Sequence, residues 1–152
     1  MMERSFANRD FFALVEQTIG EGRSITIPVN GVSMHPFIRS GRDKAVLSPF
    51  DASDLRVGAI VLFRYRGTHV MHRIVSREGG RLTMQGDGNN VSTIETAEIG
   101  DVVALVRYVI KPSGRVVDCM SEAQMRRFRM WRLLNPVRRY IMALDRRMPH
   151  RR

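Results

Sequence analysis

Between residues 24 and 110 the apolar residues recur at every second position in short runs, and this period limits what the chain can fold into. Glycine, aspartate, asparagine and serine separate the runs, as in turns between strands. The expected strands are 24–29, 44–47, 59–65, 69–76, 81–85 and 102–110. Residues 78–80, Glu-Gly-Gly, are typical of a hairpin turn between two of them. We therefore predict a mainly β body with antiparallel strands.

Helical patterns flank this body. Asn8 is expected to cap a short N-terminal helix that runs through Ile19, where glycines follow as stop signals. Beyond a turn at 111–114, apolar residues recur every three or four positions from Met125 to Met148. Asn135 and Pro136 interrupt that stripe, which favours two helices joined at a bend. We therefore expect a body at 1–118 and a basic amphipathic helical tail at 119–152.

The positive charge is concentrated in this tail. Residues 121–152 hold ten arginines against Glu122 and Asp145, so they carry +8 of the net charge of +10. The body itself is therefore not expected to bind polyanions, and we do not expect a nucleic-acid partner for it. For the tail three interpretations stay open: packing on the body, binding to an anionic membrane surface, or binding to nucleic acid.

The sequence also bears on the compartment. The first 19 residues contain three acids and no continuous apolar stretch, so they do not resemble a secretory signal peptide. No later apolar run reaches the length of about 18 to 20 residues that spans a bilayer. The single cysteine, Cys119, excludes an internal disulfide and a cysteine-built zinc site, and we expect it to be buried. We expect a cytoplasmic protein, and peripheral association with the membrane through its tail stays open.

Three separated patches carry side chains that could do chemistry. The first is 33–36, Ser-Met-His-Pro. The second is a strand in which His72 shares a face with Val70 and Ile74. The third is 86–90, Gly-Asp-Gly-Asn-Asn, which contains Asp87. Each patch alone also fits an ordinary turn or a buried histidine that is satisfied by a neighbour.

In order and spacing the patches resemble the signal peptidase and LexA-type superfamily of serine peptidases. That family shows a Ser-Met-x-Pro box, a glycine followed by an acid, a Gly-Asp-Ile-Val-type strand, a strand with the catalytic base, and a Gly-Asp-Asn loop. The similar segments here are 33–36, 41–43, 58–63, 72–75 and 86–90. The resemblance implies a LexA/signal-peptidase-like antiparallel β fold and a serine endopeptidase that cleaves a peptide or leader.

The resemblance also implies roles for single residues. Family members use either lysine or histidine as the base, and neither lysine of this chain lies at that position, which His72 occupies. Ser33 is then the nucleophile and His72 the general base and acid, as in the endoplasmic-reticulum and archaeal type. A serine hydroxyl needs such a base, and imidazole, with an ordinary pKa of about 6.5, can take its proton and return it.

This chain matches the family pattern less well at the third catalytic residue and at the oxyanion hole. Asp87 is the candidate that would orient the His72 ring, although a structural role in its turn is an equal alternative. The family builds its oxyanion hole partly from the backbone N–H of the nucleophile. A side-chain donor two residues earlier is common, but Gly31 stands there in this chain. No cofactor is expected, and no metal either, because His69 and His72 lie on opposite faces of a strand.

Two further functions stay open. A LexA-like, self-cleaving regulator has little support, because only 32 residues precede Ser33 and no Ala-Gly or Cys-Gly cleavage dipeptide occurs. A degenerate family member would bind peptides or a membrane partner without cutting them. The differences from the family pattern at Gly31 and after Asp87 fit this alternative. For the peptidase itself the expected partner is a peptide or protein substrate, bound as a strand added to the sheet.

Overall fold

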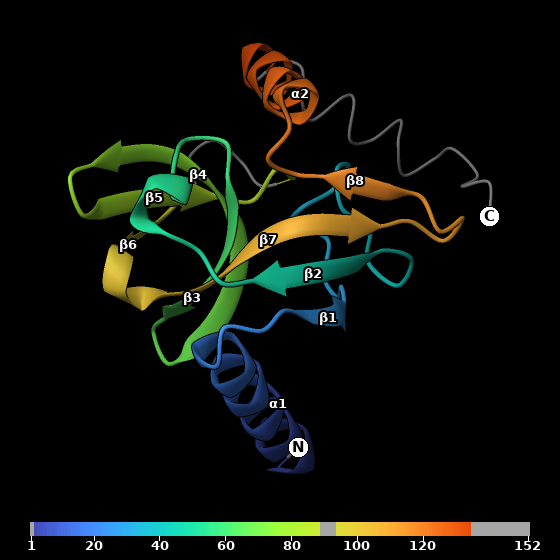
Figure 1. The fold of residues 1–152 in the computed structure, drawn as a ribbon, viewed down its shortest axis with the longest axis vertical. Coiled ribbons are helices and arrows are strands. Elements are labelled where there is room, and N and C mark those ends of the chain that lie inside the picture. The colour runs from blue at the N-terminus through green and yellow to red at the C-terminus, as the bar shows by residue number, and fades with distance from the viewer. Residues whose placement is uncertain (1, 89–93, 135–152) are drawn as a thin grey trace.

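A computed structural model describes residues 2–88 and 94–134, and its main element is a curled antiparallel sheet (Figure 1). The strands follow the order β1-β2-β7-β3-β4-β5-β6, and β8 pairs with β7 beside this path. Two helices lie at opposite ends of the molecule (Figure 1). The helices are α1 (Met2–Gly20) and α2 (Glu122–Leu133), and the strands are β1 (Ile25–Pro28), β2 (Lys44–Ser48), β3 (Ile60–Tyr65), β4 (Thr68–Glu78), β5 (Arg81–Gln85), β6 (Glu95–Glu98), β7 (Val102–Ile110) and β8 (Val116–Asp118).

The predicted mainly β fold with a short N-terminal helix is confirmed. All six expected strands occur, and the turn at 78–80 joins β4 to β5 as predicted. The strands β6 and β8 were not expected from the sequence. The helix α1 begins at Met2, so Asn8 lies inside it and does not cap it. In the tail, α2 ends at Leu133, and the predicted bend at Asn135 lies outside the described residues.

Strands β3 and β7 form the centre of the sheet and are buried on both faces. On β3, Ile60 and Leu62 belong to one apolar cluster, and Val61 and Phe63 belong to a second cluster on the other face. Alternate side chains of a strand point to opposite faces, so a strand covered on both sides reads as a continuous apolar run. The two clusters therefore share one backbone layer, and β4 pairs with β3 at the edge of this layer.

The helix α2 packs on the body over the turn before β3. Its side chains Met125, Phe128 and Trp131 are buried. A Cβ on Gly58 would lie 2.4 Å from the Met125 sulfur, and Gly58 has a φ of +102°. The close approach and the left-handed backbone both require glycine at this position. Of the interpretations of the tail, packing on the body therefore holds for this part.

Among residues 2–88 and 94–134, no helix combines the length and the apolar character that crossing a membrane requires.

Cys119 is buried, as the sequence predicted, and it is 5% exposed. Burial raises the pKa of its thiol from an ordinary value of 9.0 to about 11. Only the thiolate reacts with alkylating reagents, and this change lowers the thiolate fraction about 100-fold. We therefore expect iodoacetamide to modify Cys119 at least about 100-fold more slowly in the folded protein than in urea. Mass measurement over time checks this, and equal rates would contradict the burial.

Candidate active site

Ser33 lies in the long turn between β1 and β2, and the backbone of this turn is firmly held. The Ser33 carbonyl accepts a hydrogen bond from the Gly88 backbone N–H at 2.8 Å. Farther along the turn, the buried Asp43 carboxylate accepts from the Arg39 backbone N–H at 2.8 Å and from Lys111 Nζ at 2.7 Å. The turn therefore joins Ser33 to the segment that follows β5.

His72 lies in the middle of β4, on the face that the sequence predicted. It is paired with Val61 of β3, and its ring centroid is 6.4 Å from that of Phe63. Val70 and Ile74 share this face and pack in the same apolar cluster as Phe63. The His72 side chain keeps 10% of its surface exposed, so the ring is largely buried in an apolar wall.

The carboxylate beside His72 belongs to Glu95, which the sequence analysis missed. One Glu95 oxygen, Oε1, contacts His72 Nδ1. The other oxygen, Oε2, is buried and has no hydrogen-bond partner in the described ranges. Glu95 is paired with Met84 of β5, and Met84 is paired with Ile74 of β4, so register places Glu95 on the His72 face two strands away. The sequence gives little signal for this strand, because only one of its two alternate buried residues, Ala97, is apolar.

The Asp87 carboxylate binds Arg73 and not His72. Its two oxygens accept from Arg73 Nε at 2.9 Å and from Arg73 Nη2 at 2.7 Å. The Arg73 side chain is 4% exposed, and it also donates to the Gly58 carbonyl at 2.8 Å. The Asp87 backbone carbonyl accepts from Trp131 Nε1 at 2.8 Å. Asp87 therefore binds the turn after β5 to both β4 and α2, and the carboxylate that contacts His72 belongs to Glu95 instead.

The turn after β5 contacts both the Ser33 backbone and Arg73, the residue next to His72. Gly88, which holds the Ser33 carbonyl, follows Asp87, whose carboxylate binds the residue next to His72. In the described part of the chain no hydrogen bond joins the Ser33 hydroxyl to the His72 ring. The contacts of the turn lead to Arg73, whose side chain lies on the opposite face of β4 from His72.

The remaining expectations concern the oxyanion hole and metals. The Gly31 backbone N–H already donates to Ser40 Oγ at 3.0 Å, so it is engaged within the turn. A donor for an oxyanion would have to come from another N–H, such as that of Ser33 itself. Within the described ranges no cluster of three histidine, cysteine or acidic side chains could hold a metal ion.

Comparison with known proteins finds no matching family model, no matching curated protein and no matching solved structure. The function is therefore inferred from the arrangement of the side chains described above.

Proposed function

We propose that this protein is a serine endopeptidase that resembles signal peptidase and cleaves a peptide or leader by a Ser-His mechanism. Ser33 is the nucleophile, His72 the general base and acid, and Glu95 the residue that orients the ring. The observation that carries the proposal is the contact between His72 Nδ1 and the buried Glu95 carboxylate. A ring held at Nδ1 by a carboxylate presents Nε2 for proton transfer, which is the arrangement that serine peptidases use.

The chemistry follows from these positions. His72 Nε2 takes the hydroxyl proton as the Ser33 oxygen attacks the substrate carbonyl. The tetrahedral intermediate collapses when the imidazolium gives this proton to the leaving amine. A water molecule, deprotonated by the same nitrogen, then hydrolyses the acyl-enzyme and regenerates the hydroxyl. Glu95 stabilises the imidazolium during both steps, because its charge is buried beside the ring and little screened by water.

Asp87 has a positioning role in this proposal. It is bound to Arg73, and its turn holds the Ser33 carbonyl through Gly88. Substrate would bind as an additional strand, since β1 and β6 end the path of the sheet in the described residues.

A fluorophosphonate probe tests the nucleophile directly. We expect the probe to label the wild-type protein at Ser33, because only an activated serine hydroxyl reacts readily with it. Ser33→Ala should abolish labelling, and Ser76→Ala, which alters an exposed serine on β4, should leave it unchanged. Peptide mapping by mass spectrometry identifies the labelled residue. Equal labelling of the wild-type and Ser33→Ala proteins would refute the proposal.

The second candidate function is a protein that binds peptides without cleaving them. It is favoured by the lack of a hydrogen bond between the Ser33 hydroxyl and the His72 ring in the described part of the chain. Wild-type protein that neither reacts with the probe nor cleaves a peptide library, yet retains peptides from it, would support this alternative. Incubation at alkaline pH followed by mass measurement tests self-cleavage, and an intact mass would remove the LexA-like regulator.

A further inference from the structure

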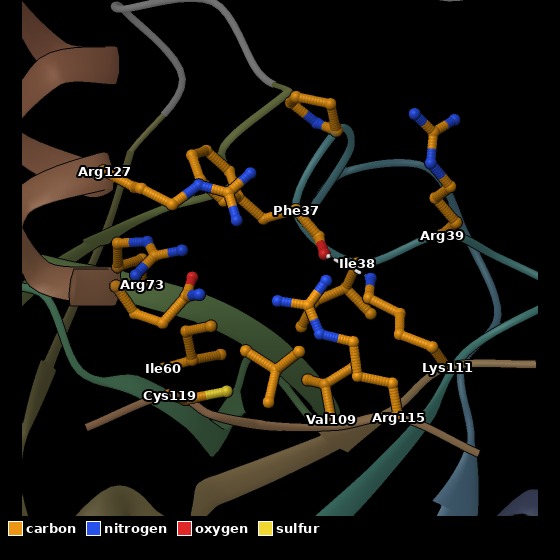
Figure 2. Close-up of a pocket in the computed structure, with 13 residues that line it drawn as sticks. Phe37, Ile38, Arg39, Ile60, Arg73, Val109, Lys111, Arg115, Cys119 and Arg127 are labelled. Atoms are coloured by element: carbon orange, nitrogen blue, oxygen red, sulfur yellow. Dashed lines mark hydrogen bonds between the residues drawn. The ribbon is translucent and has the colours of Figure 1, made fainter. Parts of the chain in front are cut away.

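A hollow lies on the other face of β4 from His72, and five of its thirteen lining side chains are basic (Figure 2). Its volume is about 260 Å³. The lining comes from the turn after Ser33, from strands β3, β4, β7 and β8 with the turns next to β8, and from α2. Five basic side chains line it, and its lining residues, all within the described ranges, include no carboxylate: Arg39, Arg73, Lys111, Arg115 and Arg127.

Two of these cations are already neutralised by the protein. Arg73 is paired with Asp87, with Nη2 at 2.7 Å from Oδ2. Lys111 Nζ lies 2.7 Å from Asp43 Oδ2 and also donates to the Phe37 carbonyl at 3.1 Å, a contact drawn in Figure 2. These two pairs build the inner wall of the hollow and need no external anion.

Arg115 and Arg127 differ from that inner pair. Neither has an ion pair with an acid of the described residues, and both are exposed. Arg127 lies 5.5 Å from the centroid of the Phe37 ring, which holds its guanidinium at the hollow. Figure 2 shows both guanidinium groups extending into the hollow, Arg127 from α2 and Arg115 from the strand end opposite, while Arg39 lies at the rim. Arg115 and Arg127 thus bring positive charge to the hollow that no acid of the described residues balances.

Part of the lining of the hollow is apolar. Ile38, Val109 and Cys119 line it and are 1%, 2% and 5% exposed. The Cys119 thiol is uncharged at neutral pH because burial raises its pKa to about 11. A ligand that fits both parts carries a multiply charged anionic group beside a small apolar group.

We propose that this hollow binds the phosphate group of a phosphomonoester with an apolar substituent. Guanidinium groups match the oxygens of a phosphate in paired hydrogen bonds, and a dianion balances two arginines. The phosphate lies between Arg115 and Arg127, and the substituent packs on Ile38 and Val109. The phosphomonoester can be a soluble molecule or the headgroup of an anionic lipid. Binding uses neither Ser33 nor His72, so it stands apart from the proposed peptidase activity.

Titration calorimetry with phenyl phosphate at low salt tests the proposal. We expect wild-type protein to bind phenyl phosphate more tightly than inorganic phosphate and not to bind phenol. The double variant Arg115→Gln/Arg127→Gln should bind phenyl phosphate at least about 10-fold more weakly, because each charge-assisted hydrogen bond contributes strongly. The double variant Arg126→Gln/Arg129→Gln is the matched control. It removes the same charge from exposed positions of α2 that do not line this hollow.

The outcomes separate the interpretations. Equal affinity of wild-type protein and Arg115→Gln/Arg127→Gln, an equal loss in the matched control, or no binding of any phosphate probe would overturn the proposal. Flotation with phosphatidylcholine vesicles, with and without phosphatidic acid, distinguishes the two sources of phosphate. Phosphatidic acid-dependent flotation that Arg115→Gln/Arg127→Gln abolishes assigns the site to a lipid headgroup. Flotation unaffected by this variant, together with variant-sensitive phenyl phosphate binding, assigns it to a soluble ligand. Fluorophosphonate labelling of Ser33 should be the same in all these variants.

Discussion

Replacing Arg73 with methionine is expected to lower the free energy of unfolding by about 3–5 kcal/mol. The guanidinium is buried, bound at two points to Asp87 and at a third to the Gly58 carbonyl. It also lies 4.7 Å from the ring centroid of Phe128 and 5.2 Å from that of Phe37. Methionine fills much of the space but leaves the Asp87 carboxylate buried without its partner, and an uncompensated buried charge is costly.

Urea denaturation followed by circular dichroism measures this change. Arg81→Met, at an exposed position on β5, is the matched control and should change the free energy of unfolding by less than about 0.5 kcal/mol. In the double variant Arg73→Met/Asp87→Asn we expect a smaller loss than the sum of the two single losses, because neither charge is then left alone. A loss below about 1 kcal/mol for Arg73→Met would show that the buried pair is not an anchor of the fold.

Replacing His72 with alanine is expected to lower kcat/KM for peptide cleavage by about 10²–10⁴-fold, the usual contribution of a general base. In the proposed mechanism, the Ser33 hydroxyl of this variant would have no base to take its proton. The neighbouring His69→Ala is the matched control on the same strand. That ring stacks on Phe12 of α1 at 4.3 Å between centroids, away from the His72 face, and its removal should leave the rate within a few-fold of wild type.

Glu95→Gln probes the orienting carboxylate in the same assay. The glutamine side chain can accept the hydrogen bond from Nδ1–H only through its amide oxygen, and it carries no charge. It therefore stabilises the imidazolium less in the transition state. We expect a lower kcat with little change in KM, because Glu95 touches the ring and not the substrate. Glu78→Gln, at an exposed position of β4, should be silent. Unchanged cleavage by His72→Ala would remove the Ser-His mechanism, and an unchanged kcat for Glu95→Gln would remove only the orienting role.

These two sets of variants act on opposite faces of one strand. His72 and Arg73 are adjacent in β4, so one faces the cluster around Phe63 and the other faces Phe37 and α2. Substitution at Arg73 should mainly reduce stability, and substitution at His72 should mainly reduce the reaction rate. If the His72→Ala protein has wild-type stability, a loss of its cleavage rate therefore reports on the mechanism and not on the fold.

The sequence by itself determined most of the local structure. The two-residue period predicted every strand whose alternate positions are apolar, and β5 and β7 have the predicted bounds. It also placed His72 on a face with Val70 and Ile74, because side-chain direction along a strand is a local property. The burial of Cys119 was likewise confirmed. The strand β6 was missed because Glu95 occupies a buried position where the pattern expects an apolar residue.

Only the tertiary structure decided which acid lies beside which partner. Asp87 and Glu95 are both acids in the segment after β5, and nothing local distinguishes them. The pairing of β4 with β5, and of β5 with β6, sets Glu95 on the face of His72, whereas the turn after β5 directs Asp87 to Arg73 on the opposite face. Strand register fixes such contacts through hydrogen bonds between residues far apart in the chain, and a period of two cannot encode them.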